Sequence, residues 1–265
     1  MTDDAAAAAP RRRKYRTRRV AAWLGSALLL ALSASTAHAL WGIHRLQAGT
    51  LVIERPRVGG GDLLRIVVGP ANRDWTPLSG IARSLQEAVV TAEDDLFWTH
   101  HGFNTLQIRR SFEENRERGR IVRGGSTVSM QLARNLFLSP ERTWVRKVRE
   151  AFLTFWIELR LPKRRILETY LNVAEWGPDL YGIGPAARRY FGKDPSRLSL
   201  RESALLAIML PAPRRYARYP TTGMTDWSRS MVDDLLLRML HRGVITEEQY
   251  EWARYAAVPD SGSVP

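Results

Sequence analysis

The stretch WVRKVREAFLTFWIELRLPKRRILETYLN, residues 144–172, decides the fold class, because its apolar side chains recur every three or four positions. That spacing is the period of an amphipathic helix. The part before Pro162 is broad and apolar enough to predict a helix of the core, and the same period continues beyond the proline to Leu171. Near the first turn of a second helix, the missing N–H of Pro162 is harmless. The stretch therefore predicts two consecutive helices.

Four further segments show the helical period: residues 81–93, 199–210, 227–241 and 246–257. The apolar stripe of the first segment ends at Glu93. In the second, Ser199 is a suitable N-cap and Glu202, three positions later, completes a capping box. Because the chain shows little of the alternation typical of strands, the predicted fold class is mainly α.

Composition sets the broad class of the protein. A chain of 265 residues with 45% hydrophobic residues is globular, with one main domain. Cysteine is absent, which excludes a disulfide framework, a thiolate nucleophile and a Cys-ligated zinc, and leaves the compartment open. The formal charge of +13 favours a polyanionic partner, namely nucleic acid, an anionic membrane surface or a phosphorylated substrate.

The N-terminus narrows this choice. Residues 11–19, RRRKYRTRR, carry seven positive charges, and the 24 positions of Val20–Ile43 contain no Asp, Glu, Lys or Arg. A basic flank before an apolar run predicts a cytoplasmic N-terminus and an exported remainder. The run can be a membrane anchor, or a signal cleaved after Ala39. A nucleic-acid-binding arm at 11–19 would not explain the apolar run that follows it.

Residues 44–80 predict a linker. They contain Gly59-Gly60-Gly61 and three prolines around one short apolar stretch, LLRIVV at 63–68. That stretch predicts a strand or an irregular connector. We expect the linker to lead into a domain at 81–258.

An acidic and aromatic cluster, EDDLFWTHHGF at 93–103, stands where the first helix gives way to a loop. Its three acids cannot all point the same way, so some are expected to be solvated or to act as caps. Glu93 stands out because Phe97 and Trp98 can desolvate it, which raises the pKa of a carboxyl and suits a base near neutral pH. The adjacent His100-His101 have no third ligand at metal-site spacing, which favours hydrogen bonding over zinc.

A second stretch, RGGSTVSMQLARN at 123–135, opens with two glycines that permit a tight turn. Ser126 or Thr127 can cap the helix that follows, and the N–H groups of such a helix end attract anions. A polar stripe then recurs along the helix at Thr127, Gln131, Arg134 and Asn135. The alternative is an ordinary amphipathic helix with a good cap, and the spacing of a P-loop is absent.

A third stretch, RKVRE at 146–150, interrupts the apolar stripe of its helix with charges. A solvated face is the usual explanation. Lys147 and Glu150 are three positions apart, however, and can share a helix face. A carboxylate that orients a lysine in this way suits a phosphate site.

Taken together, these stretches resemble the glycosyltransferase family that polymerises peptidoglycan, whose domain also stands at the front of bifunctional penicillin-binding proteins. The resemblance runs from about Ile81 to Tyr216. It rests on five ordered motifs: EDDLFWTHHGF at 93–103, GGSTVSMQLARN at 124–135, RKVRE at 146–150, KRRILETYLN at 163–172 and YGIGPAARRYFGK at 181–193. The segment LSLRESALLAIMLPAPRRY at 198–216 is similar as well. The resemblance implies a lysozyme-like, mainly α transglycosylase domain behind a single N-terminal transmembrane helix.

Position by position, the resemblance implies that Glu93 is the catalytic base for the acceptor sugar hydroxyl and that Glu150 is the second essential carboxylate. It implies that six residues line the donor site and hold the lipid diphosphate: Ser126, Thr127, Gln131, Asn135, Arg146 and Lys147. Phe97 and His100 are implied to shape the cleft. Asp94 is implied to be a supporting neighbour within the substrate-binding set.

Two positions depart from the family pattern. Met130 stands where glutamine is common, and Arg134 stands where lysine is usual. Arg134 keeps the positive charge for substrate binding but changes the geometry toward a phosphate. Asp95 is expected to be solvated, and no role is indicated for His101.

The chemistry of sugar transfer fits these residues. A sugar diphosphate already carries a good leaving group, so the enzyme needs cations for the departing charge and one base for the nucleophile. A glycoside hydrolase needs a protonated carboxyl, whose pKa neighbouring cations would lower. The basic motifs therefore favour polymerisation of lipid II with inversion at the anomeric carbon. The alternatives are a lysozyme-like hydrolase or lytic transglycosylase, and a membrane-tethered scaffold without catalysis.

The sequence contains no Ser-x-x-Lys and no Lys-Thr-Gly, so we expect a monofunctional enzyme without transpeptidase activity. The expected partners are lipid II, the nascent glycan strand, the membrane and cell-wall synthesis proteins, and not nucleic acid. The residues require no cofactor, although a divalent cation could bridge the diphosphate and a carboxylate. The resemblance implies a single-pass protein of the bacterial inner membrane with a periplasmic catalytic domain.

Overall fold

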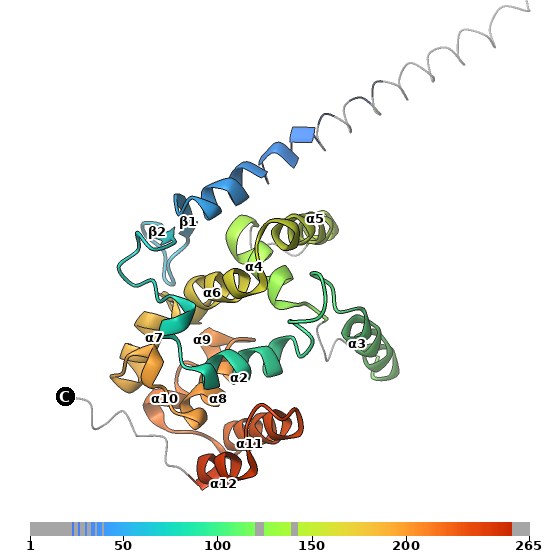
Figure 1. Ribbon diagram of the computed structural model, residues 1–265. Coiled ribbons are helices and arrows are strands. Elements are labelled where there is room, and N and C mark those ends of the chain that lie inside the picture. Colours follow the sequence, from blue (N-terminus) through green and yellow to red (C-terminus); the bar gives the residue numbers. More distant parts are fainter. Residues whose placement is uncertain are drawn as a thin grey trace, which may run out of the picture. The chain divides into compact units, whose positions relative to one another are not determined.

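The computed structural model describes residues 40–119, 125–138 and 143–255, together with scattered positions between 23 and 38. The chain divides into two units, Met1–Gly42 and Ile43–Pro265. The helices and strands named below all belong to the second unit (Figure 1).

Several expectations concern residues that the structure does not describe. The basic arm at 1–19, most of the apolar run at 20–43, the cleavage position Ala39 and Gly124 lie outside the described residues. Within the described part of the chain, no helix combines the length and the apolar character needed to cross a membrane.

One group of helices in the second unit consists of α2 (Arg83–Glu93), α8 (Leu200–Met209) and α11 (Asp226–His241). α8 is buried all round from Arg201 to Met209, as expected of a helix in the middle of a domain. α2 and α11 pack against it, and α12 (Glu247–Tyr255) packs against α11 and α8. Figure 1 shows α11 and α12 lying side by side below α2.

The predicted capping box of α8 is confirmed. The hydroxyl of Ser199 accepts a 3.2 Å hydrogen bond from the N–H of Glu202. The N–H of Ser199 donates to Oε2 of Glu202 at 2.8 Å. Two donors at the start of the helix are therefore satisfied by one pair of side chains.

A second group consists of α4 (Val128–Phe137), α5 (Trp144–Arg160) and α6 (Lys163–Val173). α4 packs against both of the others. α5 and α6 are the two helices that residues 144–172 predict, with Pro162 at the N-cap of α6. The other helical elements are α3 (Thr105–Glu117), α7 (Ile183–Phe191), α9 (Pro213–Tyr216), α10 (Tyr219–Thr222), η1 (Leu78–Gly80) and η2 (Pro195–Arg197).

The described strands form two short antiparallel hairpins. β1 (Leu51–Arg55) pairs with β2 (Leu64–Val68), and β3 (Glu175–Gly177) pairs with β4 (Leu180–Tyr181). β2 confirms the strand interpretation of LLRIVV. Helices make up most of the described elements, so the prediction of a mainly α fold is confirmed.

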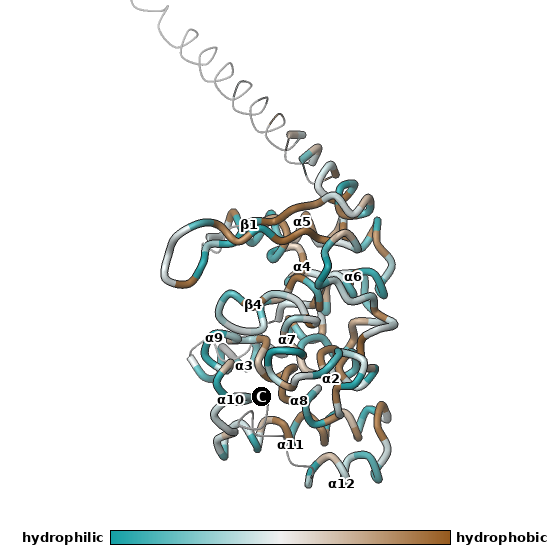
Figure 2. The backbone as a smooth tube through the Cα atoms, turned by 90° about the vertical axis from the view of Figure 1, so that its left-hand side faces the viewer, coloured by the Kyte–Doolittle hydropathy of each residue, from teal (hydrophilic) through white to brown (hydrophobic). Residues whose placement is uncertain are grey.

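α5 overturns the expectation of a core helix on one of its faces. Its buried side chains are Glu150, Leu153, Thr154 and Ile157. Its large exposed apolar side chains are Trp144, Val145, Val148, Phe155 and Leu159, of which Trp144 is 88% exposed. At about 100° per residue, the exposed set falls within one face opposite the buried set. Apolar stretches of α5 are brown in Figure 2. The period of the sequence shows that this helix has an apolar face, but it does not show what covers that face.

Candidate active site

Glu93 is the last residue of α2, where the sequence predicts the helix to end. Its Oε2 accepts a 2.7 Å hydrogen bond from Nε2 of Gln131 on α4. The hydroxyl of Tyr170 on α6 donates to Oε1 of Gln131 at 3.0 Å. Because a carboxylate only accepts hydrogen bonds, these two contacts fix which end of the amide faces Glu93. A neutral chain across three helices therefore holds the expected base.

The surroundings of Glu93 change its acidity. Burial raises its pKa, and the charge of Asp94 adds to that rise. The hydrogen bond from Gln131 and the charges of Arg134 and Arg238 act in the opposite direction without cancelling it. Burial also raises the pKa of Tyr170 well above its usual range, so its hydroxyl remains a donor to Gln131.

Asp94 is fully buried and fastens the acid cluster to α4. Its carboxylate accepts from Nε2 of His100 at 2.8 Å and from the backbone N–H of Val128 at 3.0 Å. Nδ1 of His100 accepts from the N–H of Gly102 at 3.0 Å, which places the ring proton on Nε2. The expected hydrogen-bonding role of His100 is confirmed, whereas His101 is exposed.

Gly102 permits the close approach of the first motif to α5. Its φ is 89°, and a Cβ there would lie 2.9 Å from Cγ2 of Thr154, so a larger residue does not fit. The hydroxyl of Thr127 donates to the carbonyl of Gly102 at 2.7 Å and accepts from the N–H of Met130 at 3.2 Å. Thr127, and not Ser126, is therefore the N-cap of α4. Protein side chains already satisfy two N–H groups of this helix end.

Glu150 is 1% exposed and binds two cations of its own helix. Nη1 of Arg146 donates to its Oε2 at 2.8 Å, and Nζ of Lys147 donates to its Oε1 at 2.5 Å. The expectation that Lys147 and Glu150 share a face is confirmed. Nζ of Lys147 also lies 3.4 Å from Oγ of Ser126, so Glu150 positions a cation beside the start of α4.

Phe97 is part of the loop that follows α2, and its side chain is fully buried. Nζ of Lys163 lies 4.6 Å from the centre of its ring and 2.7 Å from Oε1 of Glu158. The hydroxyl of Ser129 donates to the same Glu158 oxygen. Asp95, expected to be solvated, is half-buried and accepts a 3.3 Å hydrogen bond from Asn104.

A pocket of about 400 Å³ opens beside the C-terminal part of α4, and we call it the arginine pocket. Its lining residues are Arg55, Pro56, Arg134, Asn135, Leu138, Val173, Glu175, Tyr181 and Arg214. Arg134 and Asn135 are two of the predicted substrate-binding residues. Asn135 follows Gln131 by four positions, so the pocket begins about one helical turn along α4 from the residue that holds Glu93.

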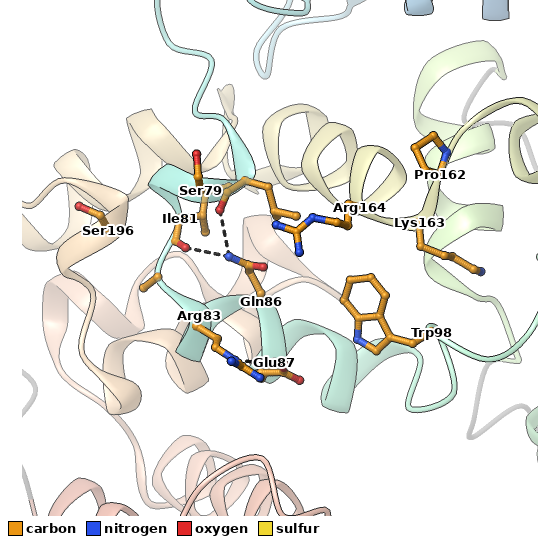
Figure 3. A pocket seen from close by; sticks show the side chains of 12 residues that line it. Ser79, Ile81, Arg83, Gln86, Glu87, Trp98, Pro162, Lys163, Arg164 and Ser196 are labelled. Atoms are coloured by element: carbon orange, nitrogen blue, oxygen red, sulfur yellow. Dashed lines mark hydrogen bonds and ion pairs between the residues drawn. The ribbon is translucent and has the colours of Figure 1, made fainter.

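A larger and more open hollow of about 940 Å³ lies between α2 and the start of α6 (Figure 3). Its lining includes Trp98, Lys163 and Arg164, but none of the predicted site residues. Gln86 donates to the carbonyls of Leu78 and Ile81 at its edge. The predicted site residues therefore lie elsewhere than in this hollow. Within the described residues, no group of three or more His, Asp and Glu side chains is placed to hold a metal ion.

Three residues of this arrangement are not singled out by the sequence patterns. Tyr170 falls within the motif at 163–172, but the helical period counts it only as an apolar position, because its hydroxyl does not alter that pattern. Arg55 lies in the predicted linker, and Arg214 is one of many arginines in the closing segment. The tertiary fold, with Arg55 on the hairpin of β1 and β2, brings them to α4.

Comparisons with known proteins identify the family. The family model described as Transglycosylase matches residues 61–239. A "Biosynthetic peptidoglycan transglycosylase" of Aromatoleum aromaticum is 52% identical over 145 residues, which cover 55% of this chain and 63% of that relative. One of Thiobacillus denitrificans is 40% identical over 204 residues, covering 74% of this chain and 87% of that relative. The chain belongs to the transglycosylase family, which confirms the resemblance.

The match spans less than two thirds of the Aromatoleum relative. Among solved structures, penicillin-binding protein 1A of Haemophilus influenzae is 18% identical, with a TM-score of 0.40. That match covers 80% of this chain and 21% of the penicillin-binding protein chain.

Proposed function

We propose that the protein is a peptidoglycan glycosyltransferase that polymerises lipid II into glycan strands and releases undecaprenyl diphosphate, without transpeptidase activity. Family membership and the names of the relatives support this reaction class. The observation that carries the proposal is the state of Glu93. It is half-buried, its pKa is raised, an amide holds it, and no ion pair engages it among the described residues. Such a carboxylate is suited to accept a proton.

In the proposed reaction, Glu93 removes the proton of the acceptor hydroxyl as that oxygen attacks the anomeric carbon of the donor. The bond from this carbon to the diphosphate oxygen breaks with its electron pair, and the configuration inverts. The diphosphate leaves as an anion, so cations can replace a proton donor at the leaving group. Gln131 and Tyr170 keep the carboxylate aimed during this step.

We assign Arg146 and Lys147 to the phosphates of the donor, with Glu150 as the residue that positions both. Nε of Arg146 is buried and has no hydrogen-bond partner among the described residues. An unsatisfied cationic donor at such a site favours an anionic ligand. Ser126, next to Lys147, would share in this binding.

Four other predicted residues, Asp94, Phe97, His100 and Thr127, are better explained as positioning residues. Asp94, Phe97 and Thr127 are buried. The hydrogen bonds of Asp94, His100 and Thr127 join the loop that follows α2 to the start of α4. We propose that they hold the end of α2 against the start of α4. Glu93 and Gln131 then stay at hydrogen-bond distance.

The rival reading as a hydrolase is less well supported. A hydrolase of this kind needs a carboxyl that gives its proton to a departing alkoxide, with a second carboxylate opposite. Arg146 and Lys147 each donate to one oxygen of Glu150, and a carboxylate bound by two cations is suited to hold those cations and not to protonate a leaving group. Transfer from a diphosphate makes no such demand.

We further propose that the domain works at the surface of the bacterial inner membrane, as a single-pass protein with a periplasmic catalytic domain. The exposed apolar face of α5 supports membrane contact, because several large apolar side chains exposed together normally mark an interaction site. Nε2 of Gln47 donates to the carbonyl of Arg160 at 3.1 Å. Gln47 lies four residues after Ile43, where the run without charged residues ends. This hydrogen bond therefore holds the chain that follows the run against the C-terminal end of α5.

Purified full-length protein and fluorescent lipid II in detergent micelles test the proposal. Formation of a polymer that lysozyme degrades is the expected result. Cleavage of finished glycan without polymerisation would show a hydrolase. A folded protein that does neither would support the scaffold alternative.

A further inference from the structure

The arginine pocket gathers guanidinium groups from three distant parts of the chain. Arg55 ends β1, Arg134 lies on α4, and Arg214 lies on α9. A pocket of about 400 Å³ falls within the range of roughly 300–1,000 Å³ typical of small-ligand sites. Arginine recurs at such sites because its planar fork matches phosphate and carboxylate groups.

The positive charge of the arginine pocket is only partly balanced by protein groups. Nε of Arg214 donates to Oε1 of Glu175 at 2.6 Å. Arg55 and Arg134 form no ion pair among the described residues, and the recorded hydrogen bond of Arg55 runs to the carbonyl of Glu54 at 3.4 Å. Three arginines and one glutamate leave a formal charge of +2 in the lining.

Burial lowers the pKa of the Arg55 guanidinium, and its interactions with Tyr181 and Glu175 only partly offset that effect. A partly buried cation without a paired carboxylate is costly unless an anion joins it. The lining is therefore suited to a doubly charged anion.

The hairpin that carries Arg55 is fixed over the pocket. Arg55 is paired with Leu64 in the ladder of β1 and β2. Three residues further on, the N–H of Val58 donates to Oδ1 of Asp179, between β3 and β4, at 2.9 Å. The segments that supply Arg55 and Glu175 are thus fastened to each other before any ligand binds.

We propose that Arg55 and Arg214, together with Arg134 and Asn135, extend the cationic site of Arg146 and Lys147 along α4, so that the diphosphate of the polyprenyl-linked donor is bound from both ends of this helix. This inference rests on the proposed function. Inversion requires the acceptor hydroxyl and the leaving group on opposite sides of the anomeric carbon, so the leaving group lies near Glu93 but displaced from it. The arginine pocket begins about one turn of α4 beyond Gln131, which meets that requirement. Arg55 lies outside the residues that the family model matches.

The test uses the full-length protein in detergent, with EDTA present and inorganic pyrophosphate as the probe in calorimetry. Arg55→Ala and Arg214→Ala should each weaken pyrophosphate binding about 10-fold or more, since each removes charge-assisted hydrogen bonds. Arg65→Ala is the matched control, because Arg65 lies on the same hairpin and its side chain is 72% exposed. Binding of pyrophosphate by the Arg65 variant should equal that of the unaltered protein.

The more conservative Arg55→Lys and Arg214→Lys serve if an alanine variant does not fold. The lysine variants keep the positive charge but lose the paired hydrogen bonds of the guanidinium, so they should weaken pyrophosphate binding several-fold. Lipid II turnover supplies the second measurement: the Arg55 variants should raise KM more than they lower kcat. Unchanged pyrophosphate affinity in folded Arg55 variants would overturn the inference, even if lipid II is polymerised. If pyrophosphate binding depends on Arg55 but the protein makes no polymer, the proposed function would be contradicted. The anion site at Arg55 would still be supported.

Discussion

Glu93 and Glu150 form the pair of carboxylates that the motifs single out, but the fold gives them opposite surroundings. Glu93 ends a helix, is half-buried and receives its hydrogen bond from a neutral amide. Glu150 lies within a helix, is 1% exposed and is engaged at both oxygens by cations. Both are acids in the sequence, but their different surroundings suit them to different roles.

The difference shows how one residue type takes two roles. A carboxylate whose pKa burial raises holds a proton more readily, which suits a base that works near neutral pH. A carboxylate between two cations instead fixes where those cations stand. Glu93 is therefore the proposed base, and Glu150 the residue that positions Arg146 and Lys147. The four predictions that follow test this contrast.

The largest effect is expected for Glu93→Gln. Without the base, the rate of lipid II polymerisation should fall by about 10²–10⁴-fold. Gln131 can still donate to the new amide oxygen, so the melting temperature should not fall. Glu87→Gln, in the same helix, is the control and should polymerise normally. If Glu93→Gln retained full turnover, the base would have to be another residue.

Glu150→Gln should act on stability as well as on turnover. Breaking a buried ion pair by removing one partner costs about 3–5 kcal/mol, because the other charge stays behind. We expect the free energy of unfolding, measured with urea, to fall by about 3 kcal/mol. The matched control is Glu113→Gln, which breaks the exposed Arg109–Glu113 pair of α3 and should cost less than about 0.5 kcal/mol. Equal losses for the two variants would refute the special role of Glu150.

The acid limb of the pH–rate profile should depend on Tyr170. The hydrogen bond from Gln131 lowers the pKa of Glu93, and Tyr170 holds that amide in place. In Tyr170→Phe the amide can turn, the pKa of Glu93 should rise, and the base should ionise only at higher pH. The acid limb of kcat/KM should therefore move to higher pH.

Tyr190→Phe controls for the loss of a buried hydroxyl, since Tyr190 donates to the carbonyl of Trp176 at 2.8 Å and does not contact Gln131. Its acid limb should stay in place. A shift of equal size in both variants would mean that general loosening of the core, and not the orientation of Gln131, moves the profile.

The smallest effect is expected on the melting temperature, because burying the ionised carboxylate of Glu93 destabilises the folded protein. A carboxyl whose pKa is raised by folding contributes stability below its unfolded pKa and loses it as pH rises through the folded value. Glu93→Gln should therefore melt at a higher temperature than the unaltered protein at pH 7, with the difference vanishing in acid. A gain of about 1 kcal/mol would correspond to roughly 2–4 °C, and partial exposure reduces it. A lower melting temperature at pH 7 would contradict the raised pKa.

Much of the fold follows from periodicity and capping. The helix ending at Glu93, the capping box at Ser199 and the pair of helices around Pro162 are all found as predicted. α3 has no comparable apolar stripe, so residues 105–117 give no helical prediction. The sequence predicts a core position for the outward face of α5 as well, because an apolar face has the same pattern whether protein or another medium covers it.

The sequence by itself determined the helical class, the family motifs and the local pair of Lys147 with Glu150, because these depend on residues a few positions apart. Only the tertiary structure decided what surrounds each acid. Gln131 reaches Glu93 across 38 positions of chain, Tyr170 reaches Gln131 across 39, and Arg55 and Arg214 line the same pocket although 159 positions separate them. Desolvation and hydrogen bonding depend on distances in space, which no local pattern encodes.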